Sequence, residues 1–284
     1  MDDDGTQADF RSIQGAINFT RQYHAETPMD ILVKAGTYEE PLYIYNQNNL
    51  TLRGEGPDNT IITYKNNEGL NSGTSNRALL LVKNADMLTL ENLTLKNSTL
   101  IGEGGQAETI YFNSDNGRLI ALNSHFISEQ DTLLLKGWTW FYHTMVAGNV
   151  DFIWGYPHVS LFENSEIRTL GDSRGKNTGG YILQARVANA TDKGFVFLNS
   201  VLTRGDSENG YAVPDGVTYL ARSGGCAECH DNITFINTRM DSHIRPVGWL
   251  DSPAPTLKLP MPKPDGVSIT AWICQAPCLM CHND

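Results

Sequence analysis

Two aspartates spaced twenty residues apart, Asp131 and Asp151, are the residues of this chain best suited to chemistry. Each lies beside apolar residues, in the strings Gln130-Asp131-Thr132-Leu133 and Val150-Asp151-Phe152-Ile153-Trp154. If one structural repeat separates them, they stack about 4.8 Å apart and cannot both ionise easily, so the pKa of one should rise. Such a pair can supply one acid and one nucleophile or base. The alternative, two solvated aspartates in turns, requires their shared register to be a coincidence.

The cysteines form a second set of candidates, because two segments repeat the pattern C-x-x-C-H. They are Cys226-Ala227-Glu228-Cys229-His230 and Cys278-Leu279-Met280-Cys281-His282, and Cys274 is left over. Three interpretations stay open: attachment of haem c, a structural zinc site made by the two Cys pairs, and disulfides that tie the C-terminal tail to the loop after residue 222. Haem is the least favoured, because the first motif runs directly into a strand expected over 233–236. Zinc and disulfides are equally compatible with the spacing, and either would be structural.

Short β-strands must position the two aspartates. After residue 24 the chain consists of strand-length apolar runs without intervening helices, which excludes a doubly wound fold. Most runs end with an asparagine in the same place, and a histidine takes that place once; the set is Asn92, Asn123, His143, Asn164, Asn199 and Asn237. The resulting coil of about twenty residues is typical of a right-handed parallel β-helix with an asparagine ladder at its corners. A β-sandwich fits less well, because its turns recur about every 8–12 residues.

A single all-β domain over residues 1–284 is the simplest organisation. Between residues 9 and 24 apolar side chains recur at a helical period, and this helix is expected to cap the N-terminal end of the solenoid; they are Phe10, Ile13, Ala16, Ile17 and Tyr23. Residues 250–284 are rich in proline and contain three of the five cysteines. This composition predicts an extended tail packed on the solenoid.

The charge of the chain limits its partners. It has 284 residues, and 21 lysines and arginines against 32 aspartates and glutamates give a formal net charge of −11 at pH 7. This charge repels nucleic acid and anionic lipid, so neither nucleic acid nor a membrane is an expected partner. No stretch approaches the roughly 20 apolar residues of a membrane span, and the acidic start is unlike a signal peptide. We therefore expect a mature or trimmed exported protein whose signal has been removed.

Five strings in the chain resemble the successive signatures of the pectin methylesterase (pectinesterase) family in its bacterial type. They are Ala35-Gly36-Thr37-Tyr38-Glu39-Glu40, Leu52-Arg53-Gly54-Glu55-Gly56, Gln130-Asp131-Thr132-Leu133, Val150-Asp151-Phe152-Ile153-Trp154-Gly155 and Tyr219-Leu220-Ala221-Arg222. They follow the family's order between about residues 5 and 249, and the two aspartate strings are the most specific. The resemblance implies a right-handed β-helix esterase that removes C6 methyl esters from homogalacturonan (pectin) and yields pectate and methanol.

The resemblance also implies a role for each matching residue. Asp151 would be the nucleophile that attacks the ester carbonyl, and Asp131 would protonate the departing methanol and then activate water to hydrolyse the acyl-enzyme. Gln106 and Gln130 match the family's amide donors to the oxyanion. Arg222 matches the arginine that holds the nucleophile charged and oriented. This chemistry requires no metal or organic cofactor.

Aromatic residues near the cleft are expected to contact the sugar. Trp249 matches a substrate-binding tryptophan of the family, and Trp154 stands where the family usually has phenylalanine; core packing is the alternative for both. The chain also departs from the pattern twice. Ser223-Gly224 replaces a common Pro-Trp, so one stacking platform is missing, and Glu108 stands where the plant-type pattern has an apolar residue.

Taken together, the motifs predict a secreted or periplasmic, monomeric aspartyl esterase that binds pectin. One alternative is another β-helix enzyme of pectin, but a lyase would need a calcium-binding carboxylate cluster and a polygalacturonase a wider carboxylate separation. A second alternative is a non-catalytic β-helix protein that binds carbohydrate, which only the missing tryptophan at Gly224 favours. A third, an electron-transfer protein, rests on the two C-x-x-C-H strings alone.

Overall fold

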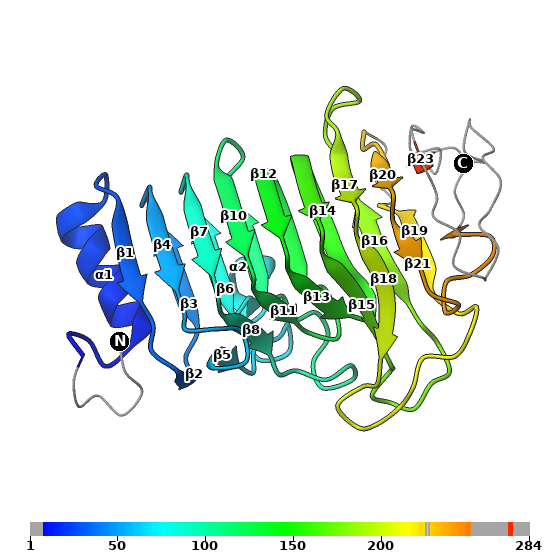
Figure 1. The fold of residues 1–284 in the computed structure, drawn as a ribbon, viewed down its shortest axis with the longest axis horizontal. Helices are drawn as coiled ribbons and strands as arrows, with labels where there is room; N and C mark the ends of the chain where they lie inside the picture. Colours follow the sequence, from blue (N-terminus) through cyan, green and yellow to red (C-terminus); the bar gives the residue numbers. More distant parts are fainter. Residues whose placement is uncertain (1–7, 225, 227, 251–271, 275–284) are drawn as a thin grey trace.

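The structure, a computed structural model, describes residues 8–224, 226, 228–250 and 272–274. They form a right-handed parallel β-helix, the architecture predicted from the asparagine spacing. Its strands stack along the long axis of the molecule, and the helix α1 (Ile13–His24) lies across the N-terminal end of the stack (Figure 1). The prediction of an all-β solenoid with a capping helix is thereby confirmed.

Each coil contributes strands to three faces. The first face contains β3 (Leu42–Tyr45), β6 (Leu80–Lys83), β9 (Ile110–Asn113), β16 (Tyr181–Ala185), β19 (Tyr219–Ser223) and β22 (Trp249–Leu250). The second contains β1 (Met29–Leu32), β4 (Leu50–Arg53), β7 (Leu88–Glu91), β10 (Arg118–Leu122), β17 (Gly194–Leu198) and β20 (Ile233–Ile236). Two long strands, β12 (Leu133–Tyr142) and β14 (Val150–Glu163), pair with strands of both faces and join them into one sheet.

The third face is a separate sheet that closes the coils. It contains β2 (Gly36–Glu39), β5 (Thr60–Tyr64), β8 (Thr94–Asn97), β11 (His125–Ile127), β13 (Met145–Gly148), β15 (Glu166–Leu170), β18 (Val201–Gly205) and β21 (Arg239–Met240). A second short helix, α2 (Thr74–Arg77), lies in the connection between β5 and β6. Because neighbouring coils align in parallel register, side chains one coil apart lie next to each other along the solenoid.

The six residues of the predicted ladder occupy equivalent corners between the second and third faces. All of them adopt the left-handed conformation, with φ between 43° and 56°. Asparagine tolerates this conformation better than most residues other than glycine, which explains its recurrence. The side chains also bond to one another: Asn123 Nδ2 donates to Asn92 Oδ1 (2.7 Å) and Asn237 Nδ2 to Asn199 Oδ1 (3.2 Å). The ladder is therefore confirmed, and backbone conformation is its cause.

We expect Asn123→Ala to lower the free energy of unfolding by about 1–2 kcal/mol, because alanine is strained at a positive φ. Asn123→Gly removes the same side-chain hydrogen bond without that strain, and it should lose distinctly less stability. Urea denaturation of the two variants measures the difference. Equal losses would mean that the hydrogen bond to Asn92, and not the backbone conformation, dominates at this corner.

Stacked phenylalanines run through the interior behind the second face. The ring centroids of Phe141 and Phe162 are 4.7 Å apart, those of Phe162 and Phe197 4.8 Å, and those of Phe197 and Phe235 4.7 Å. All four side chains are completely buried. Stacking of identical residues from successive coils favours one register between those coils. This register fixes β12 and β14, which position the two aspartates.

The capping helix begins at Ser12, which caps its N-terminus and whose hydroxyl oxygen accepts a hydrogen bond from the Gly15 N–H (3.0 Å). Its buried residues Ile13, Ala16, Ile17 and Thr20 lie on one face, and the helix packs against β3 and β1. Tyr23, which the sequence pattern grouped with the apolar face, is 60% exposed. That part of the prediction is wrong, because Thr20 takes the next buried position and the Tyr23 ring packs on Phe19 at the surface (4.9 Å).

The C-terminal tail has one described strand, β23 (Trp272–Cys274), which pairs antiparallel with β20. The rest of the predicted tail, including Cys278 and Cys281, lies outside the described residues. Cys226 and Cys229 form a disulfide with each other. This pairing differs from the bridge to the tail that the sequence suggested, and two sulfurs in a disulfide cannot serve as thiolate ligands of zinc.

Among residues 8–224, 226, 228–250 and 272–274, no group of three or more histidines, cysteines, aspartates or glutamates is arranged to hold a metal ion. In the same part of the chain, no helix is long and apolar enough to cross a membrane.

Candidate active site

The two aspartates lie side by side on neighbouring coils, as their spacing predicts. Gln130 and Val150 pair in parallel register, and the Asp131 N–H donates to the carbonyl oxygen of Val150 (3.0 Å). The side chains of Asp131 and Asp151 are only 10% and 8% exposed. Both residues have a positive φ, 62° and 47°, a conformation that is uncommon outside glycine and is found at functional sites. The corner geometry of the solenoid thus places two nearly buried carboxylates next to each other.

Arg222 on β19 binds Asp151. Its Nε donates to both carboxylate oxygens (2.8 and 3.1 Å), and its Nη2 donates to Oδ2. This hydrogen bonding to Asp151 raises the pKa of Arg222 further. A bidentate guanidinium fixes the plane of a carboxylate and compensates its charge. Asp151 is therefore held in one orientation and paired with a cation, as the resemblance implies for a nucleophile.

The environment of Asp131 differs from that of Asp151. Burial raises its pKa well above the usual range, and the negative charges of Glu108 and Asp151 raise it further. The cations Arg77 and Arg186 act in the other direction, but they do not outweigh the burial. The pair therefore combines an ion-paired carboxylate with a carboxyl group whose raised pKa favours the protonated form, which is the division of roles that acid-assisted nucleophilic catalysis needs.

A buried arginine behind Asp131 escaped the sequence analysis. Arg77, at the end of α2, donates from Nε to both oxygens of Glu108 (3.1 and 2.8 Å) and from Nη2 to Glu108 Oε1 (2.7 Å). Its Nη1 donates to Glu68 (2.8 Å), and its Nη2 lies 3.7 Å from Asp131 Oδ2. Burial raises the pKa of Glu108 even beside this cation. Glu108, which the sequence left unexplained, thus has Arg77 as its partner. The only feature of the sequence that could have pointed to Arg77 is its position directly before the apolar run 78–82.

The two glutamines predicted to bind the oxyanion lie close in sequence to these carboxyl groups. Gln130 directly precedes Asp131, and its backbone pairs with Val150. Gln106 lies in the loop before β9, and its backbone carbonyl accepts a hydrogen bond from the Glu68 N–H (3.0 Å). Both side chains are half-buried. Their function as amide donors stays a prediction.

Trp154 continues β14 three residues after Asp151 and is only 7% exposed. The guanidinium carbon of Arg186 lies 5.0 Å from the centre of its ring, a cation–π contact. Arg186 is held in place by donating to Gln184 Oε1 (2.6 Å) and to the Tyr156 hydroxyl (3.2 Å). A cation therefore lies over one face of the Trp154 ring, and the contact of Trp154 with sugar stays a prediction.

The missing tryptophan at Gly224 has a structural explanation. A Cβ at Gly224 would lie 2.4 Å from the backbone oxygen of Ala185 and 2.6 Å from Cγ of Arg186, closer than real Cβ atoms come. The segment that carries Arg186 thus occupies the space that a larger side chain would need. Trp249 is 9% exposed and packs near Phe235, with ring centroids 6.3 Å apart. Its position matches the core-packing alternative, and its contact with sugar stays a prediction.

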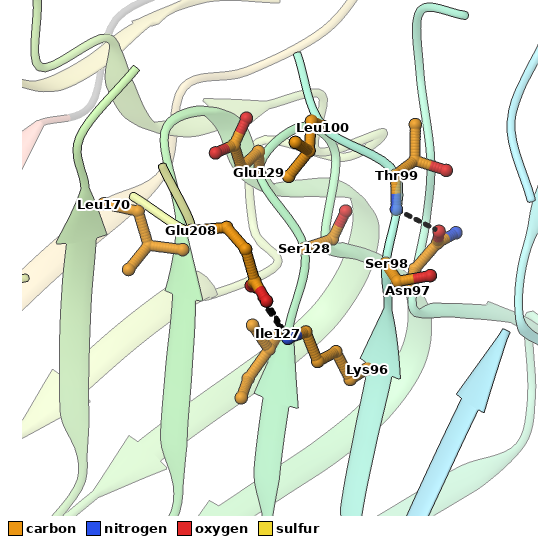
Figure 2. A pocket seen from close by; sticks show the side chains of 10 residues that line it. All are labelled: Lys96, Asn97, Ser98, Thr99, Leu100, Ile127, Ser128, Glu129, Leu170 and Glu208. Atoms are coloured by element: carbon orange, nitrogen blue, oxygen red, sulfur yellow. Dashed lines mark hydrogen bonds and ion pairs between the residues drawn. The ribbon is translucent and has the colours of Figure 1, made fainter. Parts of the chain in front are cut away.

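A small pocket on the third face is distinct from this site (Figure 2). Its cavity is about 20 Å³, enough for a water molecule and too small for a sugar. The Lys96–Glu208 ion pair (2.8 Å) spans it, as the dashed line in Figure 2 marks. Glu129, which lines it, accepts hydrogen bonds from the Ile101 N–H (2.7 Å) and the Ser173 hydroxyl (2.6 Å). The pocket therefore belongs to the packing of the loops behind the aspartates.

Comparison with known proteins places the chain among related sequences and structures. The sequence model of the family described as Pectinesterase matches residues 2–256. Pectinesterase 31 of Arabidopsis thaliana is 30% identical over 231 residues, which is 77% of this chain and 66% of that relative. The pectin methylesterase PemA from Erwinia chrysanthemi superposes with a TM-score of 0.75 at 25% identity, over 86% of this chain and 78% of its own.

A second solved structure carries a bound sugar. It is a pectin methylesterase in complex with a hexasaccharide, with a TM-score of 0.69 and 25% identity over 85% of this chain and 77% of its own. The chain spans between 39% and 66% of the length of the first three curated relatives that it matches.

Proposed function

Because the chain belongs to the pectinesterase family, we propose that it hydrolyses the C6 methyl esters of homogalacturonan and releases methanol. One observation carries the proposal: Asp151, ion-paired with Arg222, lies next to a buried Asp131 whose pKa is raised. The similar pectin methylesterase with its bound hexasaccharide supports an oligosaccharide substrate. The carboxyl groups, and not a metal, supply the nucleophile and the proton in this proposal.

The proposed reaction has two steps. An oxygen of Asp151 attacks the ester carbonyl carbon, the amides of Gln106 and Gln130 donate to the resulting oxyanion, and Asp131 gives its proton to the departing methoxide. Methanol leaves, and an anhydride links Asp151 to the sugar C6. Asp131, now a carboxylate, removes a proton from water as the water attacks this anhydride. The sugar carboxyl group is released and loses its remaining proton to the solvent, Asp151 is again a carboxylate, and Asp131 holds the proton taken from water, so both aspartates return to their starting state.

The test is methanol release from highly methylated pectin, with unsaturated products and new reducing ends followed in the same sample. We expect methanol to accumulate while the other two signals stay at background. A rise in unsaturated product would indicate a lyase, and a rise in reducing ends without methanol a polygalacturonase. Absence of all three signals would favour the non-catalytic binding protein.

We further infer that the protein is an exported monomer that acts on plant cell-wall pectin from the periplasm or the medium. The observation in support is the Cys226–Cys229 disulfide, since structural disulfides persist in oxidising compartments. Fractionation of the producing cells decides this, because accumulation of the protein in the cytoplasm would contradict it.

A further inference from the structure

One buried guanidinium, that of Arg77, faces three carboxyl groups beside the site. Glu108 and Glu68 hydrogen-bond to it, and Asp131 lies 3.7 Å from its Nη2. The side chain of Glu108 is completely buried, and those of Arg77 and Asp131 are nearly so. Glu68 is 34% exposed and its pKa is lowered to about 2, so its charge reaches water. If Glu108 and Asp131 were both ionised, the buried part of the cluster would carry two negative charges against the one positive charge of Arg77, which is unfavourable. Burial therefore favours a proton on one of the two buried carboxyl groups, Glu108 or Asp131, and the geometry indicates which one.

Glu108 takes the part of Arg77 that points toward Asp131. It accepts from Nε and Nη2 at 2.7–3.1 Å, the bidentate arrangement in which a guanidinium binds a carboxylate most strongly. Glu68 takes Nη1 at 2.8 Å. The 3.7 Å separation of Asp131 from Nη2 exceeds hydrogen-bond distance. Arg77 therefore hydrogen-bonds to the two glutamates, and its electrostatic interaction with Asp131 is weaker.

We propose that Glu108 is a positioning residue: by binding the Arg77 guanidinium in a bidentate pair, it prevents this cation from ionising Asp131 and so keeps the general acid protonated. The inference rests on the function proposed above, in which Asp131 protonates the leaving group. It also explains why Arg77 and Glu108 are buried together beside Asp131. With Arg77 present, an apolar residue at position 108 would leave the cation free to pair with Asp131.

The other charges around Asp131 come from three elements. Asp151 on β14 raises the pKa of Asp131, but its own charge is compensated by Arg222 on β19. Arg186, which follows β16, lowers the pKa of Asp131 from the Trp154 side. None of these groups contacts the Arg77–Glu108 pair through a described hydrogen bond. A change at Glu108 can therefore reach Asp131 in two ways, through the loss of its own negative charge and through Arg77, and removing Arg77 together with Glu108 separates the two.

The test is the variant Glu108→Gln, which keeps the shape of the side chain and removes its charge. Without the Glu108 carboxylate, the Arg77 guanidinium is free to pair with Asp131. A cation at this distance lowers the pKa of a carboxyl group by roughly 1–3 units. The basic limb of the kcat/KM profile, which follows loss of the acid's proton in the free enzyme, should move to lower pH by about one unit or more. Initial rates of methanol release across the pH range, corrected for non-enzymatic hydrolysis, measure the shift.

The matched control is the double variant Arg77→Gln with Glu108→Gln, which removes both charges of the pair. Its basic limb should return to within a few tenths of a unit of the wild-type position, because the cation that would ionise Asp131 is gone. A merely structural pair would lower the melting temperature of both variants and leave the limb in place. A double variant that keeps the shift of the single variant would also overturn the inference.

If Glu108→Gln does not fold, Glu108→Asp serves instead, because it keeps the charge but shortens the reach to Arg77. We expect a smaller shift in the same direction, and an unmoved limb would overturn the inference. Failure of the proposed function would give a different result, because the wild-type protein would then release no methanol at any pH. An active Glu108 variant with an unmoved limb leaves the proposed function intact and removes the role of Glu108 alone.

Discussion

Asp151→Asn should reduce methanol release by roughly 10⁴-fold or more, because an amide oxygen is too weak a nucleophile to open the ester. The substitution keeps the size of the side chain, so the fold should persist. The partner Arg222 is partly exposed and can remain hydrated without Asp151. Rates are measured on highly methylated pectin with purified wild type and variant, and the secondary structure of both is compared by circular dichroism.

The matched control is Asp86→Asn. Asp86 also accepts a bidentate pair of hydrogen bonds from an arginine, Arg118, but this pair lies on the exposed second face at β10, away from the two aspartates. The same chemical change there should leave methanol release within about twofold of wild type, because an exposed ion pair contributes little to stability. If Asp151→Asn retained more than a few per cent of the wild-type rate, the nucleophile would have to be another group.

The period of the solenoid could be predicted because a local property of the backbone enforces it. Each coil must turn through a left-handed corner, and asparagine is the side chain that best tolerates this φ. Asp131 and Asp151 could be placed together for the same reason. One coil without an inserted loop separates them, so a spacing of twenty residues in the sequence puts them next to each other on neighbouring coils. The arithmetic holds wherever no loop is inserted.

Inserted loops explain most of what the sequence did not predict. Trp154 pairs with Gln184, thirty residues away, so the twenty-residue count does not bring Arg186 to the Trp154 ring. Arg77 and Glu108 belong to neighbouring coils that are also lengthened by a loop, and nothing local marks them as a pair. The sequence could show that Glu108 was unusual, but only the stacking of the coils shows which cation it binds.

The environment of the tryptophans could not be predicted for another reason. An aromatic residue in a β-strand fits the interior and the cleft equally well, and the side that it faces depends on the register of the strand. Trp249 stands beside Ala221 in register and contacts the phenylalanine stack at Phe235. The cysteines are similar, because a C-x-x-C spacing permits several pairings and only the folded loop selects Cys226 with Cys229.

Asp131→Asn should lower kcat for methanol release by about 10³-fold, because asparagine can donate a hydrogen bond but cannot transfer a proton to the leaving methoxide. KM should change little, since the side chain keeps its size. In the wild type the raised pKa of Asp131 keeps the proton in place, so kcat/KM falls as the pH rises through that pKa. The variant should lack this basic limb, and a limb that persisted would have to belong to another group.

The same substitution should stabilise the protein as the pH rises. The folded state holds the proton of Asp131 more tightly than the unfolded chain does, so this carboxyl group favours folding fully below its unfolded pKa near 4 and loses that contribution as the pH rises through the folded pKa. Asparagine has no such dependence. Melting temperatures of wild type and Asp131→Asn should therefore diverge in favour of the variant between acidic and neutral pH. If the difference in melting temperature between the variant and the wild type became smaller over this pH range, Asp131 would be ionised in the folded protein and could not act as the acid.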